Sequence, residues 1–149
     1  MGILLTIAGI IVAIYTVSSV MGLWLSYKMM DALADGEDVP DILDDASPHH
    51  IEMISHYARG WRRHAWALSI IALFTTLIAM LIGSPLAFWA LGVALMIDSV
   101  LFVTFDNIKS FVAQTDVQER LLDTCQCLAL LASLALLLWV NLRAGEIIQ

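Results

Sequence analysis

Three side chains near the middle of the chain have the types and spacing to bind a transition metal. His49, Glu52 and His56 follow Pro48 at intervals that would place them on one face of a helix. Imidazole and carboxylate groups are ligands for zinc, iron, nickel and copper. Neither HExxH nor ExxH occurs, so a neighbouring helix or second subunit would have to add ligands. A solvated helix face is the favoured interpretation, with no resident cofactor, and a bound transition metal is the alternative.

A carboxyl group inside an apolar run is the second candidate for chemistry. Asp98 lies in the segment ALMIDSVLF, and an ionisable group within a membrane span is a functional-site hypothesis by default. It could carry protons or coordinate a cation. Alternatively, it could be protonated and hydrogen-bonded to Ser99, Thr75 or Thr76, and so fix helix packing. Because no basic residue in the apolar runs pairs with it, the sequence leaves both interpretations open.

The elements that carry these residues belong to a chain too apolar for a soluble domain. Of its 149 residues, 60% are hydrophobic, and its mean hydropathy is +0.86. A soluble chain of this length could not bury so much apolar surface in one core. Four apolar runs, each near the roughly 20 residues that cross a bilayer, cover residues 2–27, 66–82, 86–105 and 121–140. The sequence therefore predicts an all-α integral membrane protein, a single domain built as a four-helix bundle.

Several helices are expected to extend beyond the bilayer on one side. Ser47 resembles an N-cap and Pro48 a first helical position, and only Gly60 interrupts the pattern before Gly83. This predicts one continuous helix over residues 48–82. The third span is likewise expected to continue to about residue 112. The acidic linker over residues 35–46 is interpreted as a solvated connection, with a cation-attracting or partner-docking segment as the alternative.

Basic residues predict the orientation of the spans. Of the seven Lys and Arg residues, only Arg143 lies outside the two segments that join spans one to two and three to four. The positive-inside rule places those segments in the cytoplasm. Both termini and the turn at Gly83 are then on the non-cytoplasmic side of the cell's inner membrane. No basic residue precedes the first run, so an uncleaved span is expected rather than a signal peptide.

Aromatic and basic side chains are expected to anchor the protein at the two membrane surfaces. The inner surface is predicted at Trp24, Arg62, Arg63 and Trp66, and the outer surface at Trp89 and Trp139.

Small residues spaced four apart predict close helix contacts within the first span. Gly9 and Ala13 form one such pair, and Ser18 and Gly22 form another. By the helical period the two pairs lie on roughly opposite faces, so the first span is expected to touch neighbours on two sides. One seam would face the bundle, and the other could face a partner chain. The alternative is that these small residues only reflect how common such residues are in membrane helices.

The remaining patterns restrict the function class. The net charge of −7 and the lack of a basic stripe argue against nucleic acid as a partner. No phosphate-binding loop or nucleophile motif is present. The sequence predicts a non-catalytic multi-pass subunit or scaffold that assembles with itself or with other membrane subunits. A small ion or metal transporter or channel, using Asp98 and the acidic and His-containing cytoplasmic face, is the alternative. A metalloenzyme at His49, Glu52 and His56 is the third class.

Overall fold

The computed structural model describes residues 2–35, 48–105 and 117–147, and these contain five α-helices and no β-strand. They are α1 (Gly2–Asp35), α2 (Pro48–Ala58), α3 (Trp61–Leu81), α4 (Leu86–Val103) and α6 (Val117–Ile147). The predicted all-α fold is confirmed.

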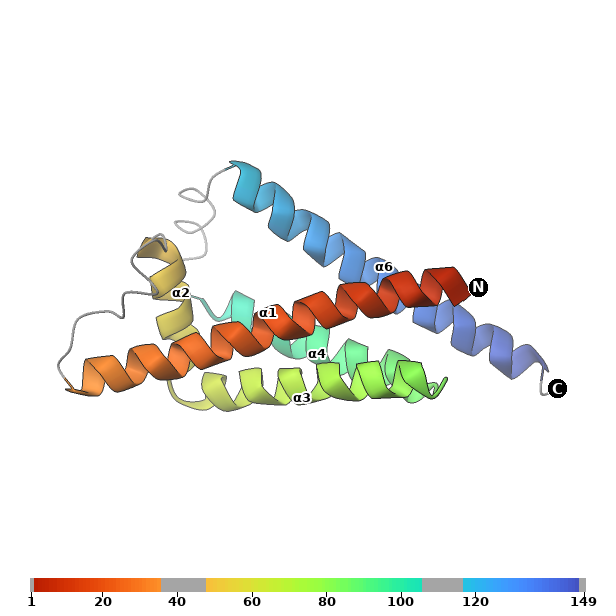
Figure 1. The fold of residues 1–149 in the computed structure, drawn as a ribbon, viewed down its shortest axis with the longest axis horizontal. Helices are drawn as coiled ribbons and strands as arrows, with labels where there is room; N and C mark the ends of the chain where they lie inside the picture. Colours follow the sequence, from red (N-terminus) through yellow and green to blue (C-terminus); the bar gives the residue numbers. More distant parts are fainter. Residues whose placement is uncertain (1, 36–47, 106–116, 148–149) are drawn as a thin grey trace.

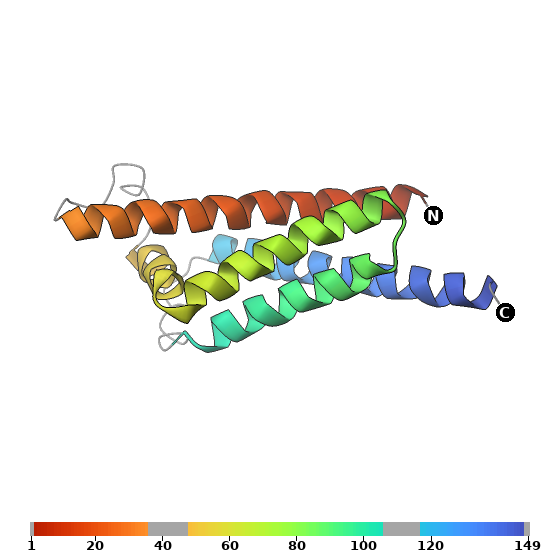
Figure 2. The ribbon, with the colours of Figure 1, turned by 90° about the horizontal axis from the view of Figure 1, so that it is seen from below.

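Four of the helices are long and apolar enough to cross a membrane. The spans are Gly2–Met30, Trp61–Leu81, Leu86–Val103 and Arg120–Arg143. Both termini and the α3–α4 connection lie at one end of the bundle (Figures 1 and 2). At the other end lie α2 and the C-terminal part of α1, and we call this the α2 end. With 34 residues, α1 is about 50 Å long and extends beyond an apolar layer of about 30 Å.

The turn between α3 and α4 is specified locally by a glycine. Gly83 has φ of 67°, in the left-handed region where residues with a side chain are strained. The amides of Gly83 and Ser84 donate to the carbonyls of Met80 and Ala79, at 3.2 and 2.8 Å. This is the Schellman pattern of a helix C-terminus. The predicted turn at Gly83 is confirmed.

The connection between α2 and α3 is a bend, and the prediction of one helix over residues 48–82 is wrong. α2 begins at Pro48, as predicted, but it ends at Ala58, and Gly60 has φ of 61° and ψ of −136°. A residue in that conformation cannot continue an α-helix. As a result α2 lies across the α2 end of the bundle and contacts α1 and α3 (Figure 1). The tertiary contacts of α2 outweigh the weak local preference for a continuous helix.

The α4 helix also ends earlier than predicted. It stops at Val103, where the Thr104 amide bonds the Val100 carbonyl and the Phe105 amide bonds the Phe102 carbonyl. The prediction that this helix continues without a break to residue 112 is therefore wrong, because the chain leaves the helix before residue 106. The later part of that extension and the acidic linker over 35–46 fall largely outside the described residues.

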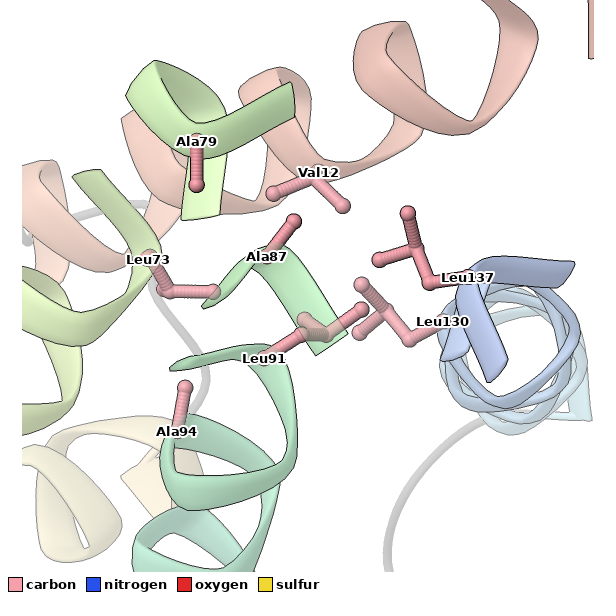
Figure 3. Close-up of a cluster of buried hydrophobic side chains, with 8 residues drawn as sticks. All are labelled: Val12, Leu73, Ala79, Ala87, Leu91, Ala94, Leu130 and Leu137. Carbon is pink, nitrogen blue, oxygen red and sulfur yellow. The ribbon is translucent and has the colours of Figure 1, made fainter. Parts of the chain in front are cut away.

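The core lies between α1, α3, α4 and the C-terminal half of α6. Figure 3 shows its eight buried side chains converging from the four helices: Val12, Leu73, Ala79, Ala87, Leu91, Ala94, Leu130 and Leu137. The facing positions of α3 and α4 include three alanines. Their small side chains let the two helix backbones approach closely, as in many membrane helix pairs.

The two halves of α6 differ in how they pack. Residues 129–143, the closed half, contribute the buried side chains of Leu130, Ser133 and Leu137. In residues 117–128, the open half, every described side chain is exposed except Gln126, which is partly buried. Figure 1 shows the open half diverging from the other helices. The four-helix bundle is therefore closed at the end with the termini and open along one side near the α2 end.

Candidate functional site

The intramembrane carboxyl of Asp98 is hydrogen-bonded to another helix. The Tyr15 hydroxyl of α1 donates to Asp98 Oδ2 at 2.7 Å. Ser69 of α3 lies close to the same carboxyl, and its hydroxyl donates to the Ala94 carbonyl of α4. Asp98 is partly buried, whereas Ser69 is only 1% exposed. Asp98 on α4 thus has a hydrogen-bond partner on α1 and a polar neighbour on α3, and the three helices meet at this point.

The helices bring these three residues together through close packing. The Ser69 hydroxyl also lies 3.4 Å from the Ala94 carbonyl of α4, to which it donates. A serine this close to a facing backbone carbonyl requires the small contact surface that Ala94 provides, and Ala94 is fully buried. The position of Asp98, one helical turn beyond Ala94, then places its carboxyl beside Ser69.

The hydroxyls suggested by the sequence as partners of Asp98 donate elsewhere. Ser99 donates to the Leu95 carbonyl, Thr75 to Ile71 and Thr76 to Ala72, each four residues back in its own helix. Such bonds satisfy a hydroxyl inside an apolar helix without a second helix. Among the described residues, Tyr15 and Ser69 are the groups that approach Asp98 instead.

Sequence reasoning missed Tyr15 and Ser69, although one signal was available. Tyr15 lies in the middle of the first apolar run, whereas tyrosines in membrane helices concentrate at the two surfaces. A tyrosine at mid-span needs a partner for its hydroxyl, and an acidic residue on another span is a natural one. Ser69 gave no such signal, because serine is common in membrane helices.

The open half of α6 faces this polar pair. Cys127 lies within range of an electrostatic interaction with the Tyr15 hydroxyl, and Ser19 lies within its hydrogen-bonding reach. Cys127 is exposed, so α6 does not seal the pair at this level. Chemically, the arrangement can hold helices together or bind a proton or cation at Asp98.

The candidate metal ligands on α2 lie outside the bundle core. Glu52 is exposed, and the His56 ring packs edge-on against Phe105 with 5.1 Å between centroids. The side chain of His49 falls outside the described residues. Among the side chains that the structure describes, no three His, Cys, Asp or Glu residues are close enough to hold a metal ion. The metal site stays a prediction.

An aromatic cluster joins α2 to the bundle near Asp98. The Tyr57 ring of α2 meets the Trp66 ring of α3 edge-on, with 5.5 Å between centroids. Burial raises the pKa of Tyr57 to about 12, and the charge of Asp98 contributes to the rise. Tyr57 therefore remains a neutral phenol at physiological pH.

The residues chosen as interface anchors lie at both ends of the bundle. Near the α2 end, Trp24 is exposed, whereas Arg62, Arg63 and Trp66 are partly buried. Near the other end, Trp89 is exposed and Trp139 lies under the Arg143 guanidinium, 4.9 Å from its ring centroid.

The predicted packing glycines both approach α3. A Cβ atom added to Gly22 would lie 2.8 Å from the Trp66 ring, and one added to Gly9 would lie 3.7 Å from the Met80 methyl. Ala13 is partly buried and Ser18 is exposed. The two glycines thus meet α3 at two levels, and α1 also contacts α6.

Comparison with known proteins adds no family to this description. No protein family, curated protein or solved structure matches the chain.

Proposed function

We propose that this protein is a non-catalytic membrane subunit that assembles with itself or with other membrane proteins. The hydrogen bond from Tyr15 to Asp98 carries the proposal. A carboxyl used as an acceptor between helices is a packing element, because interhelical hydrogen bonds stabilise membrane bundles. Ser69 of α3 is a further polar neighbour of Asp98, so the carboxyl faces polar groups on both α1 and α3.

The open half of α6 supports the same proposal. Its exposed apolar side chains, including Val117, Leu121, Leu122 and Leu128, lie on a helix whose described buried side chains all belong to the closed half. Such a surface can accept lipid or another membrane helix. A subunit that completes its bundle with a partner would have this shape.

The test combines particle mass with two substitutions at Asp98. Particles extracted with their native lipids are expected to exceed the 16.4 kDa of one chain. Asp98→Asn retains an acceptor for Tyr15, so the assembled fraction should not change. Asp98→Leu removes the acceptor and should destabilise the fold by about 1–3 kcal/mol. A particle that contains one copy and no other protein would contradict the proposal.

Transport of a proton or small cation is the second candidate. It is favoured by the partial exposure of Asp98 on the side where α6 diverges. In a transport cycle the carboxyl must change its protonation or ligation, which asparagine cannot do. A flux measured in proteoliposomes that disappears with Asp98→Asn, while the fold is retained, would replace the subunit proposal with this one.

A further inference from the structure

We propose that the bend between α2 and α3 binds the phosphate of an anionic phospholipid through Arg62 and Arg63. Both arginines lie in the first turn of α3, directly after Gly60, at the α2 end of the bundle. This site is separate from Asp98 and does not depend on the function proposed above.

The two guanidinium groups have unused hydrogen-bond donors. The Nε atoms of Arg62 and Arg63 are buried and have no hydrogen-bond partner. Neither side chain forms an ion pair or hydrogen bond with any residue that the structure describes. A buried, charged donor without an acceptor is costly, so native proteins supply one in nearly every case. Because these Nε atoms are buried, an anion outside the protein would be met by the terminal N–H groups, and an oxyanion with several acceptor oxygens suits the planar donors of a guanidinium.

The surrounding residues hold these arginines in place. The Arg63 guanidinium carbon lies 5.1 Å from the centre of the Tyr27 ring of α1, a cation–π contact. This contact holds the head group of Arg63 against α1. The N-cap residue Gly60 supplies no side-chain hydrogen bond to α3, so the free amides of the first turn add favourable potential for an anion.

Neighbouring aromatic residues place the site at the headgroup level of a bilayer. Trp61 is 55% exposed beside Arg62, and Trp24 and Tyr27 of α1 are 48% and 43% exposed. Exposed tryptophan and tyrosine side chains of membrane helices concentrate at the interface, where lipid phosphates lie. The Lys28 side chain is also exposed here and adds positive charge. The phosphate that meets these arginines is therefore that of a lipid rather than a soluble anion.

Native mass spectrometry of the full-length protein tests this assignment. The purified protein in detergent is mixed with equal concentrations of phosphatidylglycerol and phosphatidylcholine that have matched acyl chains. Two arginines at the membrane surface are expected to favour the anionic lipid roughly tenfold or more. The Arg62→Gln/Arg63→Gln variant should lose this preference. Arg143→Gln removes one positive charge at the opposite surface, also from a cation–π contact, and should retain the preference.

The other possible results of this experiment would contradict the lipid-phosphate proposal. Equal binding of both lipids by the unmodified protein would overturn the proposal, as would an equal loss in Arg143→Gln. Displacement of phosphatidylglycerol by excess inorganic phosphate would show a soluble-anion site instead. If the double glutamine variant fails to fold, Arg62→Lys/Arg63→Lys serves in its place. It should weaken binding of the anionic lipid several-fold, because lysine keeps the charge but not the planar fork of donors, and unchanged binding would contradict the geometry.

Discussion

The closed and open halves of α6 have similar residues and opposite environments. Leu137 is 5% exposed in the closed half, whereas Leu128 is 60% exposed in the open half. Both are leucines in one helix, nine positions apart by number, and both lie in the same span. Hydrophobicity therefore does not decide which leucine is buried. What differs is the surface that each one meets on α1, α3 and α4.

The closed half meets a surface built from small residues and fixed by a local turn. Ala79 and Ala87 flank the Gly83 turn, and Leu130 and Leu137 pack into the same cluster (Figure 3). Asn141 of α6 also donates to the Pro85 carbonyl at 3.2 Å, which ties the helix to this turn. The part of α1 that lies level with the open half of α6 carries Tyr15 and Ser19. The Tyr15 hydroxyl bonds Asp98, and Ser19 lies near it. The core cluster contains no residue of the open half.

The largest expected effect comes from the closed half. Leu137→Ala should destabilise the protein by about 2–4 kcal/mol, because it leaves a cavity between α6 and the core. The measurement is the free energy of unfolding in mixed micelles with increasing sodium dodecyl sulfate. A loss below about 0.5 kcal/mol would mean that the closed half is not packed as described.

The second effect concerns α1 and α3, which stay in contact at the α2 end where α6 does not. Gly22→Ala would place a Cβ atom 2.8 Å from Cζ2 and 3.0 Å from Cη2 of Trp66. The indole would have to move away from Gly22, with an expected cost of about 1–3 kcal/mol.

Gly9→Ala is the matched control for this substitution. Its added methyl group would lie 3.7 Å from Met80, an ordinary contact with a flexible side chain. The unfolding free energy should change by less than about 0.5 kcal/mol. Equal losses in the two variants would indicate a general intolerance of α1 to larger residues, rather than a specific contact with Trp66.

Much of the fold follows from the sequence, because its signals are local. Four apolar runs of bilayer length predict the spans, and a glycine followed by Ser84 and Pro85 predicts the hairpin turn. The bend at Gly60 could not be predicted in this way. Glycine permits both a continuous helix and a left-handed conformation, and the packing of α2 against α1 selects between them.

The partners of Asp98 were harder to predict than the residue itself. Tyr15 and Asp98 are 83 positions apart, and their contact depends on how α1 and α4 rotate about their axes. The apolar pattern sets these rotations weakly, since in a bilayer both the lipid-facing and the buried faces are apolar. For the same reason, the sequence did not distinguish the open half of α6 from the closed half.

Loss of the Tyr15 hydroxyl should have a smaller effect than Leu137→Ala or Gly22→Ala. Tyr15→Phe removes the donor to Asp98 but keeps the ring in place. Interhelical hydrogen bonds in membranes contribute about 0.6 kcal/mol on average and up to about 1.7, so we expect a loss of about 1 kcal/mol. In Tyr15→Phe/Asp98→Leu the loss should be smaller than the sum of the two single changes. Strict additivity would show that the two side chains do not interact.

The smallest effect is expected in the open half, and it sharpens the comparison most. Leu128→Ala is the same substitution as Leu137→Ala, in the same helix, but its side chain is exposed. In micelles the Leu128 side chain contacts detergent before and after unfolding, so its removal should change the unfolding free energy by less than about 0.5 kcal/mol.

The subunit proposal adds a second expectation for Leu128→Ala, because a partner helix on this surface would lose contacts with Leu128 that an isolated chain never makes. Leu128→Ala should then shift native particles toward a lower mass while the purified single chain keeps its stability. A loss of stability in the isolated chain as large as that of Leu137→Ala would show that the open half packs within the chain after all.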